Sequence, residues 1–260
     1  MPRFLIFRLA GPLASWGDVA VGSDRHSAPY PGRSALLGLL ASALGIRRVD
    51  ERKQRELAAG YRFAVVLCKP GELLRDYHTT QVPSSTDAKG WPLVTRRDEL
   101  AVVEWAQRSK GKAGEAILSY RDYRCDGLWM VAVQPTDDAP FPLDELREAL
   151  LRPRFCLFLG RKACPPSFPL EPQVVAAPTL FEALQKVEFH GPAHVTRVPS
   201  GRPASRGNAP LLYWEAGIDA GFEPQQSGER WDDPLSRSKW LFRPRLENHA
   251  SLPGEVLPCI

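Results

Sequence analysis

The chain has 260 residues, and its 43% hydrophobic and 25% charged residues are the proportions of a globular protein. No apolar run approaches the roughly 18 residues that a membrane-spanning helix needs, and Arg3, Arg8 and Pro12 interrupt the apolar residues at the start. The sequence therefore argues against a membrane protein and against a targeting peptide, and we expect a cytoplasmic protein.

The positive charge is carried mainly by arginine, because the 34 basic residues comprise 26 arginines and 8 lysines. The formal net charge of +4 permits a polyanionic partner without requiring one, although a guanidinium group suits phosphate recognition better than an ammonium group does. The cysteines form no CxxC pair and the histidines lack the spacing of metal ligands, so we expect no metal and no cofactor.

The first eighty residues predict a strand, a helix and a second strand. Residues Arg3–Leu9 are rich in β-forming side chains and end at a Gly-Pro turn. Residues Tyr30–Arg48 place leucines at the spacing of one helix face. Residues Tyr61–Cys68 form a compact apolar strand, after which a Pro-Gly turn leads to Glu72–Thr79.

Residues Thr80–Arg124 are an insertion too long for an ordinary connection in a compact domain, so they are either disordered or a projecting functional hairpin. The sequence then predicts a strand at Gly127–Pro135, a helix at Pro142–Pro153 and a strand at Phe155–Gly160. Strand-helix-strand, insertion, strand-helix-strand is the βαββαβ order of a ferredoxin-like or RNA-recognition-type (RRM-like) α+β domain.

The remainder predicts a smaller, β-containing C-terminal region. It has a helix near Leu180–Val187, a strand at Leu211–Ile218 and a basic, aromatic tail at Arg230–Arg245. We therefore expect three parts, which are a ferredoxin-like domain at 1–79 and 125–165, an inserted hairpin at 80–124 and a C-terminal region at 166–260.

The start of the first predicted helix, Pro31–Ser34, has the residue types of an anion site. It lacks the glycines and the lysine of a Walker loop, which excludes a nucleotide-binding P-loop. Free backbone N–H groups at a helix start, with Ser34 as cap and Arg33 beside them, would still bind an anion. The alternative is that Ser34 only caps the helix and Arg33 is solvated.

Two other stretches have the residue types of RNA recognition. Trp16, Arg25 and His26 lie in the loop before the helix, and arginines between aromatic rings suit single-stranded RNA, although a lone Trp16 is more often a packing residue. Between Arg152 and Arg206, 8 basic and 3 acidic residues leave a net charge of +5. Within that segment the loop Gly160-Arg161-Lys162 could approach a phosphate with backbone and side chain together, unless the charges are merely solvated.

For catalysis the sequence offers Tyr77 and His78, which lie beside Arg75 and Asp76. A metal-independent ribonuclease needs a base for the 2′-hydroxyl and an acid for the leaving oxygen. Neighbouring residues of a strand point to opposite faces, so Tyr77 and His78 do not easily share a site. We expect no catalytic residues, and a ribonuclease that uses this pair is the alternative.

Four blocks of sequence are distinctive when taken in order. They are LAGPLASWG at Leu9–Gly17, YPGRSALLGLLASALGIRR at Tyr30–Arg48, LRDYHT at Leu74–Thr79 and LRPRFCLFLGRKACP at Leu151–Pro165. Together they resemble the CasD family of type I-E CRISPR Cascade subunits, which belongs to the RAMP superfamily. The resemblance covers roughly Met1–Pro169, with Gly32 as a departure because relatives often carry threonine there.

The resemblance implies a noncatalytic RNA-binding subunit that holds the 5′ handle of the CRISPR RNA (crRNA). It also implies that the subunit caps a filament of CasC backbone subunits beside the large subunit CasA, in an antiviral complex that binds target DNA. Residues 80–124 would be the thumb of the family, and Gly160-Arg161-Lys162 the glycine-rich loop of the superfamily. Relatives in another CRISPR subtype instead cut the precursor crRNA. The residues that we expect to contact RNA are Trp16, Arg25, Arg33, Ser34, His78, Arg96, Arg97, Arg121, Arg124, Arg154, Arg161 and Lys162.

Overall fold

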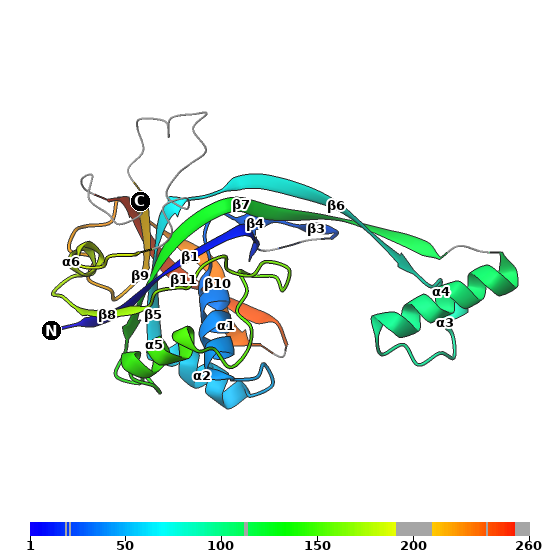
Figure 1. Ribbon diagram of the computed structural model, residues 1–260, viewed down its shortest axis with the longest axis horizontal. Helices are drawn as coiled ribbons and strands as arrows, with labels where there is room; N and C mark the ends of the chain where they lie inside the picture. Colours follow the sequence, from blue (N-terminus) through cyan, green and yellow to red (C-terminus); the bar gives the residue numbers. More distant parts are fainter. Residues whose placement is uncertain (19, 21, 112–113, 191–209, 238, 253–260) are drawn as a thin grey trace.

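The computed structural model describes all residues except 19, 21, 112–113, 191–209, 238 and 253–260. Within the described residues the protein is α+β, with helices packed on a nine-stranded, mostly antiparallel sheet from which two strands extend as a long arm (Figure 1). The helices are α1 (Arg33–Leu44), α2 (Glu51–Gly60), α3 (Ser85–Ala88), α4 (Arg96–Lys110), α5 (Leu143–Leu151) and α6 (Leu180–Gln185). The strands are β1 (Arg3–Ala14), β2 (Trp16–Gly17), β3 (Asp24–Arg25), β4 (Ser27–Ala28), β5 (Tyr61–Lys69), β6 (Glu72–Val82), β7 (Glu115–Pro135), β8 (Gln173–Ala176), β9 (Leu211–Glu215), β10 (Gln226–Ser236) and β11 (Leu241–Ser251).

The centre of the sheet consists of four antiparallel strands in the order β5-β7-β1-β8. The leucines of α1 and α5 join the core on one face, which includes Phe7 of β1, and α6 covers the core on the other face, which includes Ile6. Alternate residues of β1 are therefore buried on opposite faces, which explains why the strand is apolar almost without interruption.

The edge strand next to β1 is β8, so the predicted strand at Phe155–Gly160 is wrong. The backbone of that segment is bonded elsewhere, because Phe155 N donates to Ser42 O (3.1 Å) at the end of α1 and Leu159 O accepts from Ser15 N (2.9 Å). An apolar segment whose polar backbone groups are satisfied by a helix end and a loop does not need a neighbouring strand.

The C-terminal residues extend the same sheet instead of forming a separate layer. Strand β9 pairs with the outer edge of β5, β11 pairs with β9, and β10 pairs with β11. The helix and the strand that the sequence predicts at Leu180–Val187 and Leu211–Ile218 are confirmed as α6 and β9. Helix α2 was not predicted, and together with α1 it contacts β10.

The predicted insertion forms the outer part of the arm in Figure 1. Strands β6 and β7 pair from Glu72 opposite Cys125 out to Val82 opposite Glu115, and helices α3 and α4 form the tip. Strand β7 runs without a break from the arm into the centre of the sheet. The hairpin therefore begins closer to the body than the predicted boundary at residue 80.

Candidate nucleic-acid interface

The loop after Leu159 is held tightly against the chain that leaves β1. Gly160 has a φ of +87°, and a Cβ there would lie 1.8 Å from the carbonyl oxygen of Ser15, so only glycine fits without a shift. The turn is closed by hydrogen bonds from Leu159 N to Cys164 O (2.7 Å) and from Cys164 N to Arg161 O (2.9 Å). The backbone that carries Arg161 is therefore fixed.

Three of the predicted RNA-binding arginines meet at the base of the arm. The guanidinium carbon of Arg161 lies 4.7 Å from the centre of the Tyr123 ring, and Arg161 Nη2 donates to Arg25 O (3.4 Å). Strand β3 runs parallel to β7, with Arg25 beside Arg121. Arg121 and Tyr123 share one face of β7, because alternate residues of a strand do. We call Arg25, Arg121, Arg161 and the exposed Lys162 the arginine cluster.

The arginine cluster keeps most of its charge among the described residues, although Asp76 of β6 lies opposite Arg121. In the part of the chain that the structure describes, none of its four side chains forms an ion pair. The guanidinium of Arg161 is held by its contact with Tyr123 and its hydrogen bond to Arg25 O, and a guanidinium without an ion pair is suited to phosphate oxygens. The Tyr123 ring is half-buried against the core, and its exposed part is suited to an unpaired base. The arrangement can therefore bind a single-stranded nucleic acid.

The opposite face of the hairpin base holds a group of side chains that the sequence prediction missed. The buried Asp122 accepts two hydrogen bonds from Arg75 (2.8 and 3.0 Å), and its Oδ2 lies 3.1 Å from His26 Nδ1. The hydrogen bonds from Arg75 are the main cause that lowers the pKa of Asp122 from 3.8 to about 2, against the effect of burial. The alternation in YRDYRC (120–125) indicates this division between two faces.

Arg33 does not reach the surface, so the prediction that it contacts RNA is wrong. The residue is 8% exposed, and its side chain donates to Asp233 (2.8 Å), to Glu215 (2.5 Å) and to Tyr61 O (3.1 Å). Burial raises the pKa of Glu215, although the charge of Arg33 opposes this rise. A guanidinium that is used in this way within the core is not available to a phosphate.

The predicted anion site at the start of α1 exists, but a carboxylate of the protein itself occupies it. The backbone N–H of Arg33 donates to Asp232 Oδ2 (2.7 Å), and the residue at the cap is Gly32. A Cβ on Gly32 would lie 2.7 Å from that oxygen, so glycine leaves room for the carboxylate. The prediction that Ser34 caps the helix is therefore wrong, and β10 binds where we expected RNA.

Trp16 is buried as well, so it cannot stack on a base. It is 2% exposed and meets the Trp129 ring edge-on, with the ring centres 5.1 Å apart. The prediction that it contacts RNA is wrong, and the alternative of a packing residue is correct.

The remaining predicted arginines lie outside the arginine cluster. Arg124 donates to the carbonyl oxygens of residues 27 and 28, and thereby fixes β4 against β7. Arg154 packs against Gly45 at the end of α1. Arg96 and Arg97 begin α4 at the outer end of the arm (Figure 1). Of the segment Arg152–Arg206, residues 191–206 lie outside the described residues.

Tyr77 and His78 are neighbours on β6, and their side chains lie on opposite faces. The Tyr77 ring lies 5.4 Å from the Tyr120 ring, whereas His78 shares a face with Asp76, whose Oδ2 is 4.0 Å from His78 Nδ1. The two side chains of the ribonuclease alternative therefore do not converge. His78 is on the same face of the hairpin as Arg121.

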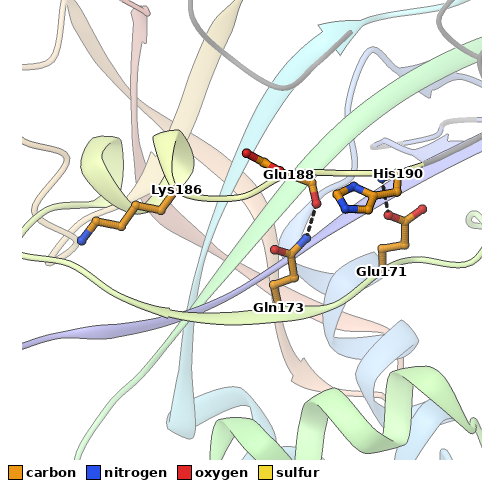
Figure 2. Close-up of a pocket in the computed structure, with 5 residues that line it drawn as sticks. All are labelled: Glu171, Gln173, Lys186, Glu188 and His190. Atoms are coloured by element: carbon orange, nitrogen blue, oxygen red, sulfur yellow. Dashed lines mark hydrogen bonds between the residues drawn. The ribbon is translucent and has the colours of Figure 1, made fainter.

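The open cavity in Figure 2 lies by β8 and α6, at the end of the sheet away from the arm (Figure 1). It has a volume of about 420 Å³ and is lined by Glu171, Gln173, Lys186, Glu188 and His190. Gln173 Nε2 donates to Glu188 O (2.7 Å) and His190 N donates to Glu171 (2.7 Å), so part of the polar lining of the cavity is already bonded.

Among the described residues no three His, Cys, Asp or Glu side chains are grouped to hold a metal ion. No described helix is long and apolar enough to cross a membrane.

Comparisons with known proteins agree on one family. The family model described as CRISPR-associated protein (Cas_Cas5) matches residues 4–246. The "CRISPR system Cascade subunit CasD" of Escherichia coli (strain K12) is 35% identical over 171 residues, which are 65% of this chain and 70% of that protein. A chain of a solved "CRISPR RNA-guided surveillance complex" has a TM-score of 0.62 and 28% identity, over 95% of this chain and 89% of that one. A second, "Crystal structure of Cas protein", has a TM-score of 0.55 and 25% identity, over 96% and 95%. The chain therefore belongs to the Cas_Cas5 family of CRISPR-associated proteins, which the CasD-like blocks of its sequence indicated.

Proposed function

We propose that this chain is an RNA-binding subunit of a CRISPR surveillance complex and that its arginine cluster holds the 5′ handle of the crRNA. The observation that carries this proposal is that Arg161 lies over Tyr123 and bonds to the backbone of Arg25, which is paired with Arg121 on β7, while none of these three arginines forms an ion pair among the described residues. Unpaired RNA is bound in this way, with guanidinium groups on phosphates and a ring on a base. The names of the Cascade relative and of the solved RNA-guided complex support the same assignment.

We also propose that the subunit caps a filament of CasC backbone subunits beside CasA, in a complex that binds target DNA. The arm supports this role because it projects from the body (Figure 1), and it exposes apolar side chains. At its tip Val94 is 85% exposed and Trp91 is 42% exposed. Apolar surface on a projecting element is suited to contact with a neighbouring protein.

We infer that the centre of the sheet is the ferredoxin-like domain of the family and that the arm is its thumb. The strand order β5-β7-β1-β8, with α1 between β1 and β5 and α5 between β7 and β8, supports this inference because it follows the βαββαβ sequence of elements. The last strand, Gln173–Ala176, lies beyond the predicted domain boundary at residue 165.

We propose further that the subunit is noncatalytic. The opposite orientation of Tyr77 and His78 supports this, because a base and an acid for the same phosphodiester must reach one site. The alternative is a metal-independent ribonuclease that processes precursor crRNA with His78, which lies on the face of the arginine cluster.

The test is binding of end-labelled repeat RNA, in the presence of a chelator, to the purified chain and to Arg121→Ala and Arg161→Ala. We expect each substitution to weaken binding about tenfold, because a hydrogen bond to a charged group contributes roughly 1.5 kcal/mol or more. Each should also reduce the slope of log K against log salt by about 1. Arg147→Ala is the matched control, since Arg147 is an exposed arginine of α5 that is paired with Glu148.

Two results would contradict the proposal. Equal weakening in Arg147→Ala would mean that RNA responds to charge in general and not to the arginine cluster. A discrete cleavage product on a denaturing gel, lost in His78→Ala, would make the chain a ribonuclease.

A further inference from the structure

A second group of basic side chains lies where β10 turns into β11. Most arginines around this hairpin are neutralised inside the protein by carboxylates. The paired arginines are Arg33, Arg230, Arg243 and Arg245, and their partners are Glu215, Asp232, Asp233 and Glu247. Arg237 in the turn and Arg48 after α1 differ, because within the described ranges neither forms an ion pair.

Arg48 is connected to the turn in two ways. Its Nε donates to Arg237 O (3.0 Å), and its guanidinium carbon lies 3.9 Å from the centre of the Trp240 ring. Trp240 has a φ of +52°, which a bulky residue rarely adopts, and yet it is 59% exposed. The turn thus presents a tryptophan ring to solvent while an arginine covers part of it.

Arg237 packs its side chain against α1. Its Nη2 donates to Ser34 O, and both of its terminal nitrogens would lie 3.6 Å from a Cβ at Gly38. Burial, followed by the charge of Arg48, lowers the pKa of Arg237 to about 10, and no carboxylate opposes that effect. Arg237 remains protonated at neutral pH, so two positive charges lie near each other, and the carboxylate of Glu51 in the same region accepts a hydrogen bond from Ser236 Oγ (3.0 Å).

We propose that Arg48, Arg237 and Trp240 form a second nucleic-acid site, separate from the arginine cluster. It would bind a phosphate of a single-stranded segment between the two arginines and stack the adjacent base on the exposed part of the Trp240 ring. Lys239, which is exposed in the same turn, adds a further positive charge. The ligand chemistry is a phosphodiester beside an unpaired base, which RNA and single-stranded DNA share.

The test uses the full chain carrying Arg121→Ala and Arg161→Ala, so that the arginine cluster does not dominate, and short fluorescent oligouridylate and oligothymidylate as probes. We expect Arg48→Ala to weaken binding of at least one probe about five- to tenfold and to reduce the salt slope by about 1. Trp240→Ala should weaken the same probe by a similar factor and leave the salt slope unchanged, because stacking releases no counterions. A preference for one probe identifies the ligand as RNA or as DNA.

The matched control is Arg52→Ala, because Arg52 is an exposed arginine of the neighbouring α2 that is paired with Glu56 (3.3 Å). It should leave both affinities unchanged, and Arg48→Gln provides a second variant of the exposed arginine. Equal affinities in the Arg48 and Arg52 variants would overturn the proposal. The proposal also fails if Arg48→Ala binds both probes normally but no longer copurifies with another subunit, because the turn would then be a protein-binding surface. Either failure leaves the assignment of the arginine cluster intact.

Discussion

Two Gly-Arg pairs in this chain look alike in sequence and differ in their surroundings. In Gly32-Arg33 and in Gly160-Arg161, a Cβ atom added to the glycine would lie close to an oxygen atom. The distance from that Cβ to the oxygen would be 2.7 Å at Gly32 and 1.8 Å at Gly160. At Gly32 the oxygen belongs to a carboxylate of β10, and at Gly160 it is a backbone carbonyl. In both pairs the glycine allows a close approach, and the arginine that follows is positioned by it.

The environment of each arginine decides its role. Arg33 turns into the body and pairs with Asp233 and Glu215, whereas Arg161 lies over Tyr123 without an ion pair among the described residues. The partners of Arg33 come from strands about two hundred residues away in the chain. A short motif therefore cannot distinguish an arginine that is paired in the core from one that lies outside the core.

Replacement of Arg33 by methionine should have the largest effect in this comparison. Glu215 would remain buried without its arginine, while Asp233 would keep its bond to Arg243 (2.6 Å). We expect the free energy of unfolding to fall by about 3 to 5 kcal/mol, the usual result when one partner of a buried ion pair is removed. Arg161→Met should change it by less than about 0.5 kcal/mol. Urea denaturation of both variants measures the difference, and similar losses would contradict the two assigned roles.

Replacement of each glycine by alanine sharpens the comparison. Alanine at Gly160 must adopt a φ of +87° and collide with a backbone carbonyl oxygen, whereas Gly32 has an ordinary φ of −80° and its nearest neighbour is a side-chain oxygen at the longer distance of 2.7 Å. We expect a loss of about 2 to 3 kcal/mol for Gly160→Ala and of about 1 kcal/mol for Gly32→Ala. Gly160→Ala should also weaken RNA binding, because the loop that carries Arg161 must shift. An equal loss of stability in both glycine variants, with RNA binding intact in Gly160→Ala, would contradict the different roles assigned to the two glycines.

The elements with local apolar periodicity could be predicted from the sequence. The strand at Arg3–Leu9, the helix within Tyr30–Arg48 and the strand at Gly127–Pro135 are confirmed, because burial of one or both faces fixes their side-chain pattern. The strand at Phe155–Gly160 was predicted from the same kind of apolar run. It failed because hydrogen bonds to distant backbone groups, which no local pattern contains, hold that segment.

The candidate site could be predicted only residue by residue. Arg25, Arg121, Arg161 and Lys162 were each identified from type and position, but their convergence depends on the pairing of β3 with β7 and on the packing of a loop. Trp16 was misassigned because a tryptophan next to arginines has the same sequence signature whether it is buried or exposed. Burial of such a ring is decided by the tertiary fold.

The ion pair of Asp122 is intermediate in burial between that of Arg33 and the surroundings of Arg161. Asp122 is buried, while its partners Arg75 and His26 are half exposed. The pKa of Asp122 is about 2 in the folded protein, below the ordinary value of 3.8 that applies to the unfolded chain. The contribution of ionised Asp122 to the stability of the fold is therefore complete above pH 3.8 and is lost as the pH falls toward 2. Asp122→Asn should remove this acid-side dependence and lower the free energy of unfolding at neutral pH by about 1 to 2 kcal/mol. Urea denaturation across that pH range measures both effects. An unchanged acid-side slope in Asp122→Asn would show that other carboxylates cause it.

The smallest effect is expected for Trp16→Phe, which tests whether the Trp16 ring packs in the core or binds RNA. Trp16 is 2% exposed, and its Nε1 has no hydrogen-bond partner within the described residues, so Trp16→Phe loses ring volume but no hydrogen bond. We expect the free energy of unfolding to fall by about 1 kcal/mol, because phenylalanine retains an edge-on contact with Trp129. Binding of repeat RNA should remain unchanged, whereas Tyr123→Ala, beside the arginine cluster, should weaken it. If Trp16→Phe instead reduced RNA affinity at unchanged stability, the ring would have to leave the core to meet a base, and the loop before α1 would belong to the interface after all.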